Sequence, residues 1–315
     1  MNPSALLRLS ALPLALAASS LSAQTLLNED FSDTERATQN LTSSSAWNLL
    51  TGTAAIGGAT NASNLSASSG GLVYTQPTTG TANTGVTANL VTYFTTAGSP
   101  RALADGETLS VSFTLAVSAL NSSTAAGTFR FGLFDSGATS TRISADSFGS
   151  GGGNFTNSAF TNDGGYTIGF NPGSTATGVT INERNAASVN AANTALFSSN
   201  AAVTTTIATS SLAIGATAAT PFSVSFSIAR VGTSYNLSST INGQTISFTD
   251  TSISASAFDQ FALQYSSTSV GTPGTITLDN LNIGVTSAIP EPSSFAALAG
   301  LGALGLVATR RRRAA

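Results

Sequence analysis

The feature that most constrains the fold of this chain is a period-two alternation of apolar and polar residues. In the clearest stretch, residues 109–117, every second position is Leu, Val or Phe and the positions between are Ser, Thr or Ala. The same spacing recurs in residues 129–133, 166–170, 222–228, 235–237, 246–248, 261–265 and 276–285. Successive side chains of a strand point to opposite faces of the sheet, so this spacing predicts half-buried antiparallel strands.

Turn residues separate these stretches. Asn242-Gly243 is the strongest short hairpin signal, because both residues tolerate the positive φ that a tight hairpin turn needs. Residues 185–220 are rich in Ala, Ser and Thr, which indicates either weak strands, such as residues 203–207, or a long surface excursion. Many short strands without a helical period predict an all-β fold, an antiparallel β-sandwich or a barrel.

The N-terminal residues have the pattern of a secretory signal peptide. Arg8 supplies the positive charge, residues 9–18 form an apolar run too short to span a bilayer, and small residues follow up to Ala23. We therefore predict that residues 1–23 are removed by signal peptidase. The charge, the short run and the small residues all argue against the alternative, a buried N-terminal helix.

The C-terminal residues 290–315 combine a Pro-Glu-Pro motif, an apolar segment and four arginines. Prolines resist helix formation, so the motif should be extended and accessible to a protease. Residues 293–309 predict a transmembrane helix of about 25 Å. The arginines that follow should stay in the cytoplasm, which places the preceding residues across the inner membrane.

In this order and position, the C-terminal pieces resemble the PEP-CTERM sorting signal of Gram-negative bacteria. The resemblance implies a membrane protease, exosortase, that recognises the motif and removes the tail. The protein would be anchored transiently and then reach the cell surface or the extracellular space. An ordinary single-span anchor that is never removed is the alternative. The residues matched to the signal are Pro290, Glu291, Pro292, Arg310, Arg311, Arg312 and Arg313.

Residues 24–289, between the two targeting segments, are long enough for one large all-β domain or two small ones. They contain no Cys, His or Lys, so thiolate metal sites, His- or Cys-based triads and a Lys Schiff base are excluded. Six arginines stand against thirteen acids, a net charge of −7, which argues against binding of nucleic acid.

Catalysis by two carboxylates remains open on composition, because glycoside hydrolysis needs only an acidic pair. No predicted strand carries the alternating Glu, Asp and Glu of concanavalin-like glycosidases. Asp105 and Glu107 have a suitable spacing, but they flank a glycine in a predicted turn. We therefore predict that the protein is not an enzyme.

Both ends of this middle part also resemble concanavalin-like and laminin-G-like jelly rolls, which include carbohydrate-binding modules. The resemblance rests on residues 26–33 (LLNEDFSD), 258–263 (FDQFAL) and 277–283 (TLDNLNI). It implies that the first and last strands pair and that a structural Ca²⁺ lies near them, with Glu29, Asp30 and Asp279 as candidate ligands and Asp33 close by. Acids that merely cap strands and face water are the alternative.

Sugar binding commonly uses exposed aromatic side chains, and Trp47 is the candidate because its neighbours are polar. A buried Trp47 is the alternative. The sorting tail and the missing catalytic side chains favour a non-catalytic cell-surface or matrix protein, and the resemblance to PEP-CTERM proteins implies an association with exopolysaccharide. A glycan-binding module and a glycoside hydrolase are the alternatives, and a row of exposed aromatics or a facing carboxylate pair would distinguish them.

Overall fold

The computed structural model describes residues 23–36, 46–52, 64–75, 86–118, 128–137, 142–149, 157–172, 178–185, 195–198, 201–267, 274–287 and 300. The chain divides into two units, and Ala23–Ser287 form one of them. We call this unit the body. The other unit comprises Met1–Ser22 and Ala288–Ala315, of which only Gly300 is described.

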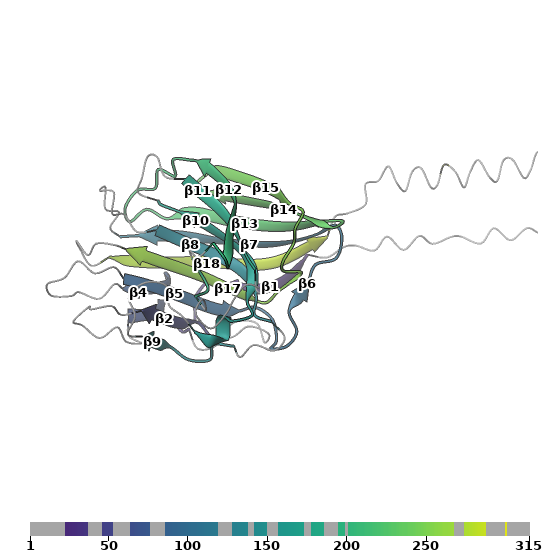
Figure 1. Cartoon of the computed structure of the whole chain (residues 1–315). Coiled ribbons are helices and arrows are strands. Elements are labelled where there is room, and N and C mark those ends of the chain that lie inside the picture. Colours follow the sequence, from purple (N-terminus) through teal and green to yellow (C-terminus); the bar gives the residue numbers. More distant parts are fainter. Residues whose placement is uncertain are drawn as a thin grey trace, which may run out of the picture. The chain divides into compact units, whose positions relative to one another are not determined.

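The body is an antiparallel β-sandwich of two eight-stranded sheets (Figure 1). Sheet A has the order β15-β14-β13-β7-β18-β4-β3, with β1 also paired to β18, and sheet B has the order β12-β11-β10-β8-β17-β5-β2-β9. A short pair, β16 and β6, is separate. This architecture confirms the predicted fold class.

The first nine strands are β1 Gln24–Glu29, β2 Asn48–Gly52, β3 Leu65–Ser68, β4 Gly71–Thr75, β5 Val86–Tyr93, β6 Arg101–Ala102, β7 Glu107–Val117, β8 Thr128–Asp135 and β9 Ser147–Gly149. After the 3-10 helix η2 Ser158–Phe160 come β10 Gly164–Phe170, β11 Gly178–Arg184, β12 Thr204–Ser211, β13 Phe222–Val231, β14 Ser234–Ile241, β15 Gln244–Asp250, β16 Ala257–Phe258, β17 Gln260–Ser267 and β18 Thr275–Ser287.

The alternation in the sequence corresponds to the two faces of the strands. In β7, Leu109, Val111 and Leu115 are buried against the opposite sheet, whereas Ser112 between them is exposed. The main core lies between the sheets and is rich in aromatic contacts, such as the edge-to-face pair of Phe113 and Phe131 with ring centroids 5.2 Å apart. Burial of this apolar face holds the two sheets together.

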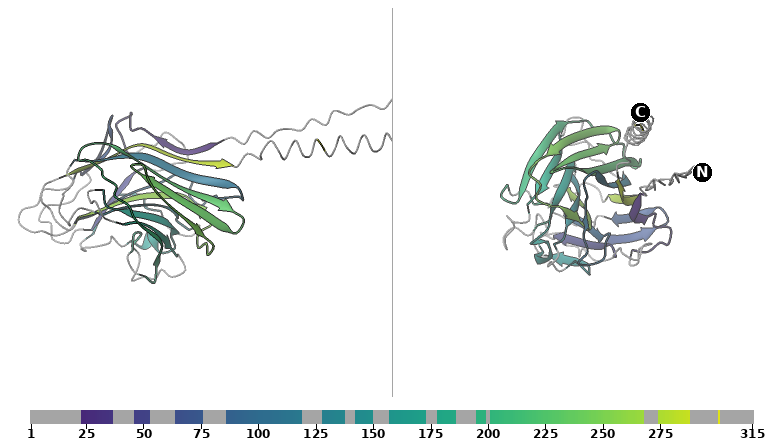
Figure 2. Two further views of the ribbon diagram at one scale, coloured as in Figure 1. Left: turned by 90° about the horizontal axis from the view of Figure 1, so that it is seen from above. Right: turned by 90° about the vertical axis from the view of Figure 1, so that its right-hand side faces the viewer.

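The first and last strands pair, as the jelly-roll resemblance implies. Antiparallel β1 places Gln24 opposite Val285 and Glu29 opposite Leu281, and Figure 2 shows the purple β1 beside the yellow-green β18. We call the end of the sandwich where β1 begins and β18 ends the terminal end, and the opposite one the far end. A bulge interrupts the pairing of β18 with β7 between Asp279 and Asn282.

The hairpin-turn prediction and the weak-strand prediction are also confirmed. Asn242 and Gly243 have φ values of 47° and 80° and connect β14 to β15, which is the geometry of a type I′ hairpin turn. The weak strand expected at residues 203–207 is β12, which pairs with β11 and is the last strand at one edge of sheet B.

The predicted membrane segments lie outside the described residues, apart from Ala23 and Gly300. Within the part of the chain that the structure describes, no helix is both long and apolar enough to cross a membrane.

Candidate functional site

The outer face of sheet B carries a groove of about 470 Å³ over strands β8, β10, β11 and β12. This volume lies within the range of small-ligand sites. Hydroxyl, amide and guanidinium groups line most of it: Arg130, Asn171, Asn182, Ser198 and the threonines 167, 180, 204 and 206. The groove runs along the strands, from Thr204 at the start of β12 to Asn171 and Gly178 at the far ends of β10 and β11.

The pairing of the strands explains why these polar side chains gather. Thr167 lies opposite Asn182, and Asn182 lies opposite Thr206, so three neighbouring strands contribute to one row. The residues that alternate with them, including Ile168 and Ile181, are fully buried in the main core. Because alternate side chains leave opposite faces of the sheet, burial of the isoleucines directs the polar row outward.

Asn182 is the centre of this row. Its amide nitrogen donates to the hydroxyls of Thr167 at 3.4 Å and Thr180 at 3.3 Å, and its carbonyl oxygen accepts a hydrogen bond from Thr206 at 2.7 Å. The side chain is thereby held in one orientation. The three hydroxyls retain capacity for a ligand, since each hydroxyl has one donor and two acceptor positions.

Arg130 forms one side of the groove. Its guanidinium donates to the carbonyl oxygen of Phe197 at 2.9 Å and to the side-chain oxygen of Gln264 at 3.4 Å. Partial burial lowers the pKa of the guanidinium, which nevertheless stays protonated at neutral pH. Gln264 in turn donates to Asn89 at 2.9 Å, so the polar row continues across sheet B beyond the groove.

Glycine opens the floor of the groove. A Cβ atom at Gly169 would lie 2.8 Å from the hydroxyl oxygen of Thr180, closer than real side chains approach. Gly169 lies opposite both Arg130 and Thr180, so a larger residue would fill the space between them. The glycine therefore keeps the sheet backbone accessible beside the polar row.

The described lining of the groove contains none of the carboxylates that glycoside hydrolysis requires. Among the described residues that line it, none is Asp or Glu, and Arg130 is the one charged side chain. Asp105 lies in the predicted turn before β7, and Glu107 is the first residue of β7, where it forms an ion pair with Arg101 at 2.6 Å. The arrangement can offer hydrogen bonds to a ligand, but no facing acidic pair.

Next to the groove, loops cover the outer face of sheet B and bury a second apolar cluster. This cluster includes Phe134, Phe160 and Phe197. Arg184 lies fully buried beside it and donates to the carbonyl oxygens of Leu196, Asp163 and Phe160. These loops limit the groove on the side of the terminal end.

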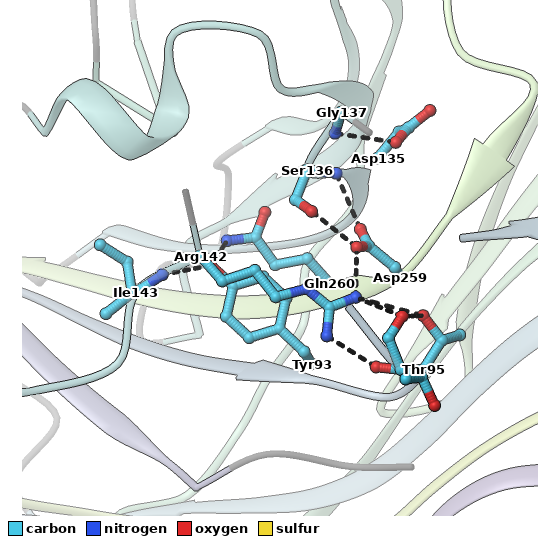
Figure 3. A network of polar contacts seen from close by, with 10 residues as sticks. Tyr93, Thr95, Asp135, Ser136, Gly137, Arg142, Ile143, Asp259 and Gln260 are labelled. Atoms are coloured by element: carbon cyan, nitrogen blue, oxygen red, sulfur yellow. Dashed lines mark hydrogen bonds and ion pairs between the residues drawn. The ribbon is translucent and has the colours of Figure 1, made fainter. Parts of the chain in front are cut away.

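A polar network ties the same loop layer to the terminal end of sheet B (Figure 3). Arg142 forms an ion pair with Asp259 at 2.7 Å and lies 4.5 Å from the centre of the Tyr93 ring. Asp259 also accepts hydrogen bonds from the backbone nitrogen of Ser136 at 2.7 Å and from its hydroxyl at 2.6 Å. The chain contains no His, so this Ser–Asp contact lacks the base of a catalytic triad.

Trp47 is not the exposed aromatic platform that its polar neighbours predicted. It is 1% exposed and packs between Phe31 and Phe261, with ring centroids 6.1 and 6.0 Å away. The residue lies just before β2, and its backbone nitrogen donates to Arg36. The bend at Arg36 and the start of β2 direct the indole inward, which polar neighbours in sequence could not reveal. Tyr74, Tyr93, Tyr166 and Tyr235 are also buried.

The candidate calcium ligands are not assembled into one site. Within the described ranges, no group of three or more acidic, His or Cys side chains could hold a metal ion. Glu29 accepts a hydrogen bond from the backbone nitrogen of Phe31 at 2.8 Å, and Asp30 accepts one from Ser32 at 3.0 Å. Asp279 accepts hydrogen bonds from Asn280, which has a φ of 51° at the bulge of β18. These carboxylates hold local turns, and Asp33 does the same by accepting from the backbone of Glu35. Glu29 is 1% exposed, however, and so does not face water as the alternative expected.

Sequence reasoning missed the residues of the groove. Arg130, Thr167, Thr180 and Asn182 occupy the polar positions of alternating strands, so the signal was present. It is indistinguishable, however, from the polar positions of any solvated face until the pairing of the strands is known. The predicted sorting residues, Pro290–Pro292 and Arg310–Arg313, lie outside the described residues.

Comparison with known proteins supports the two resemblances separately. Residues 288–313 match the family model described as the PEP-CTERM protein-sorting motif. No curated protein matches the chain in sequence.

Among solved structures, the chain is similar to an endo-1,3-β-glucanase from Streptomyces sioyaensis, with a TM-score of 0.51, 16% identity, and coverage of 84% of this chain and 97% of that one. It is less similar to the potassium-bound carbohydrate recognition domain of Emp46p (TM-score 0.44, 8% identity, 76% and 87% covered) and to lectin UEA-II complexed with galactose (0.43, 14%, 83% and 98%). At these identities the likeness concerns the fold alone.

The sorting-motif match implies export to the cell surface and an exosortase partner. The chain is therefore a jelly-roll β-sandwich protein that carries a PEP-CTERM sorting motif at residues 288–313.

Proposed function

We propose that the protein is a non-catalytic surface or matrix protein whose body binds a neutral polysaccharide in the groove of sheet B. The observation that carries this proposal is the lining of the groove: several hydroxyls, two asparagine amides and one guanidinium, without a carboxylate. Sugar hydroxyls both donate and accept hydrogen bonds, and Ser, Thr and Asn side chains match them in both roles.

Charge favours a neutral ligand over an acidic one. Residues 24–289 have a net charge of −7, so a polyanion would be repelled over most of the surface. Arg130 is the one cation of the groove among the described residues, and it already donates to Phe197 and Gln264. Its remaining N–H groups suit a sugar hydroxyl or ring oxygen.

The mode of binding should be weak for each sugar unit. Phe170 and Phe197 line the groove, but each is only 2% exposed, so neither offers a face for stacking. A dedicated glycan-binding module usually gains much of its affinity from such faces. A matrix protein that holds a long polysaccharide by repeated weak contacts fits this groove better.

The lining also disfavours the glycoside hydrolase alternative. Hydrolysis needs an acid and a base or nucleophile on either side of the scissile bond. The described lining residues supply neither, and the chain has no His or Cys to replace them.

For the C-terminal tail, we propose the finer steps of the sorting pathway in a Gram-negative bacterium. The span 293–309 would hold the exported protein in the inner membrane, and Arg310–Arg313 would fix its orientation. An exosortase-like protease would then cut near Pro290–Pro292 and release the body to the cell surface or the matrix. The match of residues 288–313 to the sorting motif supports this order of events.

Binding to polysaccharide tests the proposed role of the groove. The double variant Asn182→Ala, Thr206→Ala removes a hydrogen-bonded pair from the groove. We expect it to bind a neutral polysaccharide about fivefold more weakly for each lost hydrogen bond. Retention of the purified body on immobilised neutral polysaccharides, with a glycan array to choose the sugar, measures the effect.

The chain offers a closely matched control. Thr249 donates to Asn236 at 2.8 Å on sheet A, the same chemical pair in the same geometry, but away from the groove. Asn236→Ala, Thr249→Ala should leave binding unchanged. Equal losses in both double variants, or no binding of the wild-type body to any neutral polysaccharide, would refute the proposal.

A further inference from the structure

The two ends of the body are held side by side in sheet A. β1 begins at Gln24, opposite Val285, and β18 runs on to Ser287, opposite Glu107 of β7. Because β1 is hydrogen-bonded to β18, neither end of the body can move away from the other without breaking the sheet.

The targeting segments adjoin these strand ends almost without a linker. β1 starts one residue after Ala23, the predicted last residue of the signal peptide. Only Ala288 and Ile289 separate the end of β18 from Pro290. Three residue steps extend at most about 10 Å, so the linker between β18 and the sorting motif is short.

The surface at the terminal end is formed by well-anchored turns. In the turn between β13 and β14, the backbone nitrogen of Gly232 donates to Asp105 at 2.6 Å, and Arg230 donates to the carbonyl oxygen of Leu103 at 2.6 Å. Val231 in this turn is 54% exposed, the highest value among the large apolar side chains of the described residues. An exposed valine on a fixed turn is suited to contact the boundary of a lipid layer.

We propose that the terminal end is the surface that the body presents to lipid headgroups while the tail is still in the membrane. The turn between β13 and β14 then rests against the bilayer. The groove opens on the outer face of sheet B, along the side of the sandwich, and stays open to polysaccharide before processing. This inference rests on the proposed membrane span at residues 293–309.

Two labels at opposite ends of one strand test this orientation. Thr233 lies just before β14, and Gln244 lies just after the turn that follows β14. Because β14 has eight residues, the two positions are separated by roughly 27 Å along the sheet. Both residues are exposed, and the chain has no cysteine, so Thr233→Cys and Gln244→Cys each give a single labelling site. The full uncleaved chain carries an environment-sensitive fluorophore and is reconstituted in phosphatidylcholine liposomes with a headgroup quencher.

We expect several-fold stronger quenching at Thr233→Cys than at Gln244→Cys. Equal quenching, or the reverse order, would overturn the orientation. As a second measurement, a Gly-Ser linker of about 20 residues inserted after Ser287 spans roughly 25 Å and should abolish most of the difference. A difference that survives the linker would show that the short junction does not set the orientation. If the full chain fails to float with the liposomes, the proposed membrane span and the orientation that rests on it both fall.

Discussion

At the residue scale, Asp163 is the most unusual side chain of the body. It is fully buried before β10, and within the described part of the chain neither carboxylate oxygen has a hydrogen-bond partner. Desolvation raises its pKa well above 3.8, although the nearby positive charge of Arg184 opposes the shift. A buried carboxylate without donors destabilises the folded state whenever it is ionised.

We predict that Asp163→Asn stabilises the body at neutral pH. Between 3.8 and the raised pKa, the folded state keeps a proton that the unfolded state has lost. Stability of the wild type therefore falls as pH rises through this window, whereas the variant has no such proton. Unfolding by guanidinium chloride should show that Asp163→Asn has a larger free energy of unfolding than the wild type at pH 7, and that this difference is small at pH 3. A variant less stable than the wild type at pH 7 would show that the carboxylate is stabilised in the fold.

Residue environments were the least predictable part of the molecule from sequence. Trp47 has polar neighbours along the chain, but its three-dimensional neighbours are Phe31 and Phe261, more than two hundred residues apart from each other. The expected pairing of β1 and β18 suggested that Glu29 and Asp279 share one site. Each instead accepts a hydrogen bond from the backbone of its own turn. Contacts of this kind depend on long-range pairing, which a local pattern does not contain.

At the scale of elements, prediction was much more successful. The alternation in residues 109–117 predicted β7, and Asn242-Gly243 predicted the turn between β14 and β15. These features depend on one strand or one turn, so local chemistry decides them. The assignment of strands to sheets A and B was beyond reach, because both sheets use the same alternation. The groove was missed for that reason.

The pairing of β1 with β18 can be strengthened by a disulfide. Asn28 lies opposite Asn282, and their side chains already form a hydrogen bond of 3.2 Å. Because the chain lacks cysteine, Asn28→Cys with Asn282→Cys can form only one pairing. We expect the oxidised variant to be more stable than its reduced form by about 2–4 kcal/mol, since the disulfide closes a very long loop. Chemical unfolding with and without reductant measures this, and equal stability of the two forms would contradict the pairing.

At the scale of the whole molecule, the body and the tail have separate tasks, and sequence alone separates them well. The match to the sorting motif covers residues 288–313. A motif that a protease recognises and a segment that inserts into a membrane are both local in sequence, so sequence alone can identify them. The proposed polysaccharide site of the body is not encoded locally, since β8, β10, β11 and β12 together form the groove.

The tail prediction concerns Glu291. Replacing it with Ala keeps the apolar span and the arginines but removes the carboxylate between the two prolines. We expect the Glu291→Ala chain to remain uncleaved in the membrane, while Ser293→Ala, one residue beyond the motif, is processed normally. Mass spectrometry of the mature C-terminus in the native host distinguishes the outcomes. A wild-type protein that still ends at Ala315 would show that the tail is a permanent anchor.

The position of β18 has a consequence for how the chain folds during export. β18 is the last strand in sequence, yet it lies inside sheet A, where it pairs with β7, β4 and β1. During export the N-terminal part of the chain crosses the membrane first. β1 and β7 therefore emerge long before β18, the strand with which both of them pair. These pairings are separated by very long stretches of sequence, which makes their formation slow. Sheet A can close only after residue 287 has crossed the membrane. If the proposed span at residues 293–309 stops translocation, the fold is completed just as translocation ends.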